Sequence, residues 1–268
     1  MSPSFHTTDC TSAWGGRRGT HRYLEDVFRF LFRPKWIAFH LLCLAGIIGM
    51  LLLSRWQFDR LDQRRDFNAE VRERTSEPVL DLSKSDSLQP TELQWRPVGA
   101  KGEYLNDEQV LIVNRSQDGR AGSNVVTPLR LEDGRIVLVI RGFIGLDDTA
   151  PDAPSGTVRV LGTARLGEQR RTGQSAEASG ELTEFLRLDI DRIAQQLDGD
   201  VLGFAIAAEA SDPADDPSLT PVALPELTEG PHLSYAIQWI IFSIAVLVGW
   251  VLAVRVSLRR STRSTPSA

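Results

Sequence analysis

The sequence predicts a membrane protein in which two transmembrane α-helices flank a small β-rich (α+β) domain of barrel or sandwich type, on the outer side of the membrane. Two apolar blocks near the two ends of the chain predict the helices. A change from helical to alternating periodicity between them predicts the strands. A mean hydropathy of −0.16 conceals this division, because the polar middle outweighs the two apolar blocks in the average.

The first apolar block covers residues 36–54, and the second covers residues 235–254. Each is long enough to cross roughly 30 Å of hydrocarbon as a helix. The sequence Arg55-Trp56-Gln57-Phe58, which follows the first block, is a poor signal-peptidase site. We therefore expect the first block to be retained as an anchor.

Basic residues near the ends of these helices predict their direction. Arginine and lysine are balanced around the first helix, whereas Arg255, Arg259, Arg260 and Arg263 follow the second. The basic tail 255–268 and the N-terminal tail 1–35 are therefore both expected in the cytoplasm. Residues 55–234 then form the extracytoplasmic domain of a multi-pass protein in the bacterial inner membrane, with the lipid bilayer as one partner.

Residues 55–74 predict a juxtamembrane helix that continues out of the membrane. Trp56, Arg60 and Arg64 recur every fourth residue, with aspartates between them. A solvated helix stabilised by ion pairs one turn apart accounts for this pattern. A helix that docks on a partner is the alternative.

From Gln94 onwards the periodicity indicates strands, and Asp133-Gly134 predicts a hairpin between two of them. Ile190, Ile193, Ala194 and Leu197 share one face of a short helix. We expect four to six strands and one or two helices. The expected strands are Gln94–Tyr104, Gln109–Asn114, Asn124–Leu131, Ile136–Arg141, Thr157–Ala164 and Val201–Glu209, with a helix over Asp189–Leu197.

Two segments are expected to be irregular. Residues 167–180 are polar and rich in small side chains, and residues 211–231 contain five prolines. Proline favours extended backbone, so residues 211–231 are expected to form a semi-rigid tether that leads into the second helix.

Composition excludes several function classes. A net charge of −5 argues against nucleic-acid binding, which needs a basic face. Cys10 and Cys43 both lie outside the middle domain, and up to the tether that domain has no histidine. It therefore lacks the residues for a Ser-His-Asp triad or an ordinary zinc site. The acidic doublets Asp147-Asp148 and Asp215-Asp216 are interpreted as solvated turn carboxylates, so we do not expect an enzyme.

The segment that opens the second helix contains His232, Tyr235 and Trp239, which lie on one helical face. A neutral imidazole beside aromatic rings at an apolar boundary is suited to ligating haem iron. The alternative is that these residues are interfacial anchors and that Ser234 only caps the helix. His40 lies near the opposite membrane face, so it could not share one haem with His232.

Several short motifs follow one another along the chain. Their positions are Trp56, Gln57, Arg60, Trp95, Arg96, Gly102, Tyr104, Asn114, Arg115, Gly122, Thr127, Pro128, Arg141, Gly142 and the block His232–Trp239, including Gln238. In this order, the motifs resemble those of the Surfeit locus protein 1 family of cytochrome c oxidase assembly factors. Ile140, Phe143 and Gly145 depart from residues common in the family, and these departures affect the end of one strand.

The resemblance implies a factor that helps deliver haem a to the haem-bearing subunit of the oxidase, or that stabilises this subunit. It also implies that His232 is the haem ligand and that haem a is held transiently. The alternative is an accessory subunit or scaffold docked on the oxidase without its own haem. A sensor is disfavoured because the tails are too short for an output module.

Overall fold

The computed structural model describes residues 32–84, 89–175 and 180–263. The chain divides into two compact units: residues 1–65 with 229–268, here called the helical unit, and residues 66–228, called the strand unit. Most of the expected tail 1–35 and the end of the tail 255–268 lie outside the described residues. Each unit is described separately.

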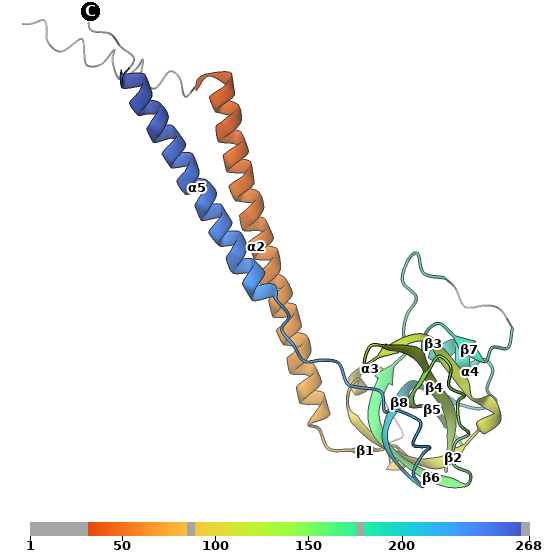
Figure 1. Cartoon of the computed structure of the whole chain (residues 1–268). Coiled ribbons are helices and arrows are strands. Elements are labelled where there is room, and N and C mark those ends of the chain that lie inside the picture. The colour runs from red at the N-terminus through yellow and green to blue at the C-terminus, as the bar shows by residue number, and fades with distance from the viewer. Residues whose placement is uncertain (1–31, 85–88, 176–179, 264–268) are drawn as a thin grey trace, which may run out of the picture. The chain divides into compact units, whose positions relative to one another are not determined.

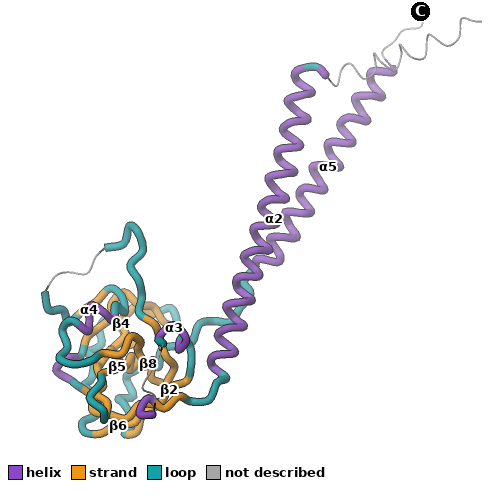
Figure 2. The backbone as a smooth tube through the Cα atoms, turned by 180° about the vertical axis from the view of Figure 1, so that it is seen from behind, coloured by secondary structure: helices purple, strands orange, loops and turns teal. Residues whose placement is uncertain are grey.

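The helical unit contains two long helices, α2 (Pro34–Thr75, whose last residues belong to the strand unit) and α5 (His232–Arg263). They lie side by side (Figures 1 and 2). Their apolar side chains are largely exposed, as in Leu42 and Ile241. Within the described residues, these two helices have the length and composition needed to cross a membrane.

Helix α2 continues through the expected junction between residues 54 and 55 without a break. Residues 51–75 contain neither glycine nor proline, so nothing in this stretch interrupts the helical hydrogen bonds. Pro78 follows soon after the last helical residue, where proline is common. The expected transmembrane and juxtamembrane helices are therefore one helix.

The strand unit is built on one mixed sheet with the order β1-β2-β6-β8-β5-β4-β3-β7. An additional antiparallel pairing joins β2 to β4, so β2, β6, β8, β5 and β4 form a closed ring. The strands are β1 (Leu80–Asp81), β2 (Pro97–Tyr104), β3 (Val110–Gln117), β4 (Arg120–Leu131), β5 (Ile136–Gly145), β6 (Thr157–Leu166), β7 (Glu184–Phe185) and β8 (Val201–Asp212).

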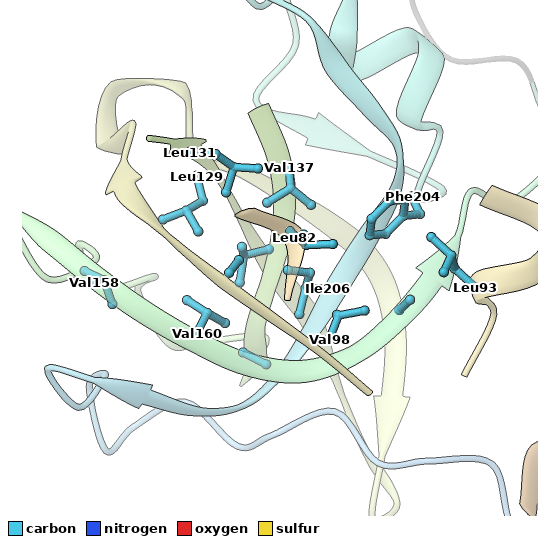
Figure 3. Packing of buried hydrophobic residues seen from close by; sticks show 14 residues of the cluster. Leu82, Leu93, Val98, Leu129, Leu131, Val137, Val158, Val160, Phe204 and Ile206 are labelled. Atoms are coloured by element: carbon cyan, nitrogen blue, oxygen red, sulfur yellow. The ribbon is translucent and has the colours of Figure 1, made fainter. Parts of the chain in front are cut away.

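Apolar side chains fill the inside of this ring. Leu129, Val137, Val160 and Ile206 come from four of its strands and point towards one another (Figure 3). They are almost fully buried, as alternate residues of strands with one inward face are expected to be. This core explains the alternating sequence pattern and confirms a strand-rich domain between the two apolar helices.

A second apolar layer covers the outside of β5 and β8. Leu138 and Ile140 of β5 pack there against Phe185 of β7 and Ile193 of helix α4 (Ile190–Ala194). Strand β5 is thus buried on both faces, which explains its continuous run of branched apolar residues. The side chain of Asp189 accepts a hydrogen bond from the backbone of Arg192 and caps α4.

The expected hairpin forms between β4 and β5, with Gly134 at φ +89°. The sequence did not indicate the two-residue strands β1 and β7. It also did not indicate three one-turn elements, namely η2 (Leu82–Lys84), α3 (Pro90–Leu93) and η3 (Asn106–Glu108). Such short elements form through contacts with distant parts of the chain, which a local pattern does not contain.

Candidate functional site

The residues singled out from the sequence form three groups, and the first contains His232. This histidine is the first residue of α5, and its Nδ1 lies 2.9 Å from Oε1 of Gln57 on α2. A carbonyl oxygen only accepts hydrogen bonds, so Nδ1 donates and carries the proton. In the neutral imidazole, Nε2 is then the nitrogen that keeps its lone pair.

This arrangement is the one that metal-ligating histidines usually show, with one ring nitrogen fixed by an acceptor and the other directed to the metal. Gly230, at φ +66°, lies beside the same ring. A Cβ at this position would lie 3.6 Å from Nε2 of His232, which is an ordinary contact, so access to that nitrogen does not depend on this glycine. An imidazole nitrogen held in this way is a donor that fits a haem iron.

Aromatic residues occur on the neighbouring turns of both helices. Tyr235 is exposed, and Trp239 is half-buried with its ring at an edge-to-face angle to Phe242. On α2, Trp56 is also exposed, and the guanidinium of Arg60 lies 5.6 Å from the centre of its ring. These side chains offer flat, accessible surface of the kind that covers a porphyrin. The last singled-out residue here, Gln238, is exposed.

Polar contacts join α2 and α5 at further levels. The hydroxyl of Ser54 donates to the backbone carbonyl of Ala236 at 3.0 Å, and both residues are buried. Beyond that level, Arg65 donates two hydrogen bonds to the carboxylate of Glu229, in the segment just before α5, at 3.0 and 3.1 Å. The buried contact of Ser54 helps to fix the register of the two helices. His232 and Gln57 are therefore held together by their helices.

His40 takes part in a contact of the same kind at another level. Its Nδ1 accepts a hydrogen bond from the indole of Trp250 at 2.7 Å. The ring of His40 thus has a structural partner on the opposite helix.

The second group surrounds Arg141 of β5, whose side chain is fully buried. Its guanidinium donates to both carboxylate oxygens of Asp215, at 2.8 and 2.5 Å. It also donates to the side chain of Gln109 at 2.7 Å and to the carbonyls of Pro151 and Asp152, at 2.8 and 3.0 Å. Buried charges persist when they are paired and hydrogen-bonded in this way. Arg141 therefore joins two loops to the sheet.

Thr127 and Tyr104, also singled out, complete this group. The hydroxyl of Thr127 donates to Gln109 at 2.9 Å, and the ring of Tyr104 lies 5.7 Å from the guanidinium of Arg141. Burial raises the pKa of Tyr104, and the negative charge of Asp215 raises it further. The phenol therefore remains neutral at physiological pH.

The interpretation of Asp215 as a solvated turn carboxylate is wrong. Its side chain is only 17% exposed, because it forms the ion pair with Arg141. Arg141 lies 74 residues away in the sequence, so no local pattern indicated the pairing. Gln109 was missed as a partner for the same reason.

The third group lies around Trp95, which adopts an unusual left-handed backbone conformation (φ +69°). The guanidinium of Arg165 stacks 3.9 Å from the centre of its ring. Arg115 forms an ion pair with Glu168, at 2.8 Å. Three further motif positions have structural roles. Arg96 forms an ion pair with Glu77, and Asn114 has φ +59° where the pairing of β3 and β4 is irregular. The carbonyl of Pro128 accepts a hydrogen bond from the backbone N–H of Leu105. No cluster of potential metal ligands occurs among the described residues.

Comparison with known proteins agrees with these motifs. The model of the SURF1 family matches residues 44–244. This range includes most of α2, the whole strand unit and the first part of α5. The chain belongs to the SURF1 family. An uncharacterized SURF1-like protein of Mycobacterium tuberculosis is 28% identical over 230 residues, covering 82% of this chain and 83% of the relative.

Other SURF1 relatives are more distant. A SURF1-like protein of Rickettsia bellii is 24% identical over 215 residues, covering 76% of this chain and 86% of that protein. Surfeit locus protein 1 of Xenopus tropicalis is 26% identical over 145 residues, covering 46% and 47% of the two chains. The resemblance found in the sequence motifs is thus confirmed at the level of the family.

Proposed function

We propose that this SURF1 protein is a non-catalytic biogenesis factor for haem–copper cytochrome c oxidase. It receives haem a through His232 and presents it to the haem-bearing oxidase subunit. The hydrogen bond between His232 and Gln57 carries this proposal, because it leaves Nε2 of His232 unprotonated. Haem a is cargo here, and the described residues supply one nitrogen ligand with aromatic surface beside it.

Replacing His232 by alanine is expected to abolish haem binding, because the replacement removes the ligand nitrogen. Replacing Gln57 by leucine removes the acceptor that fixes the ring, and loss of such a partner lowers affinity about 10–100-fold. The full-length protein is purified in detergent from cells that make haem a, and the haem bound per protein is measured by absorbance. His40→Gln is the control, because this histidine is bonded to Trp250, and its haem content should be unchanged.

Equal haem content in the His232→Ala variant and the parent would reject His232 as the ligand. A haem-free preparation that still co-purifies with the oxidase would favour the accessory-subunit alternative. Unchanged haem content of the oxidase after deletion of the gene would contradict the biogenesis role.

We also propose that α2 and α5 span the bacterial inner membrane with both termini in the cytoplasm and the strand unit outside. The length and apolar composition of the two helices and the basic residues after α5 support this topology. Alkaline phosphatase fused near residue 150 is expected to be active, and fusion of the same enzyme after residue 268 inactive. The reverse pattern would contradict the topology.

A further inference from the structure

A pocket of about 370 Å³ lies in the strand unit, on the outside of the closed ring. Strands β3, β5 and β6 contribute to its wall, together with Trp95 and residues 222–225. Its volume falls within the range of small-molecule sites in proteins. The proposed role of His232 does not involve this pocket.

Arg165 is the residue in this wall that requires an explanation. It is only 9% exposed, and one face of its guanidinium is covered by the ring of Trp95. Within the described part of the chain, it makes no hydrogen bond or ion pair. Burial lowers its pKa to about 10, and the negative charge of exposed Glu209 opposes this shift. The guanidinium thus remains charged at neutral pH without a bonded partner.

The other charges of the wall do not neutralise Arg165. Its charged members are Arg115, Arg165 and Glu168, and Glu168 is already paired with Arg115. One positive charge therefore remains. The Nε of Arg115 is also buried without a hydrogen-bond partner among the described residues. Buried donors of this kind are rare in proteins unless a ligand or water satisfies them.

The rest of the wall is mixed: Gln94, Ser116, Gln117 and Asn124 supply polar side chains, and the other residues are apolar or aromatic. Trp95, Ile140 and Phe143 line it, and Phe143 is in turn covered by the guanidinium of Arg120 at 5.8 Å. A guanidinium stacked on a ring directs its N–H groups outwards in its own plane, parallel to the ring. That geometry suits a flat, bidentate acceptor lying beside an apolar surface.

We propose that this pocket binds a small organic acid through its carboxylate, with Arg165 as the main partner and the aromatic wall around the body of the ligand. A carboxylate is planar and carries one negative charge, which matches the single unpaired positive charge of the wall. A phosphate dianion would leave one negative charge without a counter-charge among the residues of the wall, which is unfavourable.

The test is calorimetric titration of the full-length protein in detergent with benzoate, and with benzamide as the uncharged analogue. Benzoate is expected to bind, and benzamide to bind at least about tenfold more weakly, because charge-assisted hydrogen bonds are the stronger kind. Arg165→Gln should weaken benzoate binding by a similar factor. Arg159→Gln is the matched control, because Arg159 lies on the same strand but is exposed and outside the pocket.

A second variant keeps the test decisive if Arg165→Gln does not fold. Arg165→Lys keeps the charge but loses the planar fork, and it should bind benzoate with intermediate affinity. Absence of benzoate binding by the folded parent, or equal binding by the Arg165 and Arg159 variants, would overturn the proposal. Tighter binding of inorganic phosphate than of benzoate would also overturn it.

Discussion

Replacing Arg141 by alanine is expected to lower the free energy of unfolding of the strand unit by about 3–5 kcal/mol. The replacement leaves the carboxylate of Asp215 in a mostly buried position without its counter-charge. It also removes one of the two donors to Gln109, which keeps its bond from Thr127, and the donors to the carbonyls of Pro151 and Asp152. Unpaired buried groups of this kind are among the few causes of large losses of stability.

Hydrogen exchange of the full-length protein, followed by mass spectrometry, reports on the strand unit separately from the long helices. Amides of β5 should exchange at least about a hundredfold faster in the Arg141→Ala variant, because local and global opening become easier. Lys101→Ala is the control, since Lys101 forms an exposed ion pair with Glu132. Such surface pairs contribute about 0–1 kcal/mol. Equal protection in the two variants would show that the Arg141 network does not stabilise the fold.

Only part of the network around Arg141 could be predicted from the sequence. The motif positions Tyr104, Thr127 and Arg141 were found in the sequence, and the structure brings them together around one buried charge. Their partners Gln109 and Asp215 carry no motif, and Asp215 lies in a proline-rich segment that resembles solvated loop. Only the closure of the sheet places that loop against β5.

The two long apolar helices and the main strands were easier to predict, because each depends on a local pattern. An apolar stretch of sufficient length indicates a spanning helix, and the alternation in β2 indicates a strand with one buried face. The continuous apolar run of β5 predicted a strand, and the structure adds that this strand is buried on both faces. The two-residue strands β1 and β7 carry no such pattern.

The pair His232 and Gln57 was predicted in part: the residues were found in the sequence, but their contact was not. Both were singled out from motifs, but they are 175 residues apart, and nothing in the sequence indicated that their side chains are bonded. The pairing of α2 and α5, fixed by buried Ser54 and by Arg65, brings the two motifs together. The chemical argument for a free Nε2 therefore required the structure.

Replacing Gly102 by alanine is expected to destabilise the strand unit by about 3 kcal/mol, the upper part of the usual range for overpacking. Gly102 lies in β2 opposite Leu131, where β2 pairs with β4 and closes the ring. A Cβ at this position would lie 2.1 Å from the backbone carbonyl oxygen of Arg130. A clash with backbone cannot be relieved by a change of rotamer, so the two strands would have to separate.

Gly99→Ala is the matched control, because it makes the same substitution three residues away in the same strand. A Cβ there would meet only a side-chain methyl of Val79, at 3.5 Å, which is an ordinary contact. Both substitutions restrict the unfolded chain equally, so this effect cancels in the comparison. Hydrogen exchange of β2 and β4 amides should therefore be much faster in Gly102→Ala than in Gly99→Ala. Similar protection of these amides in both variants would show that the ring can close without a glycine at this position.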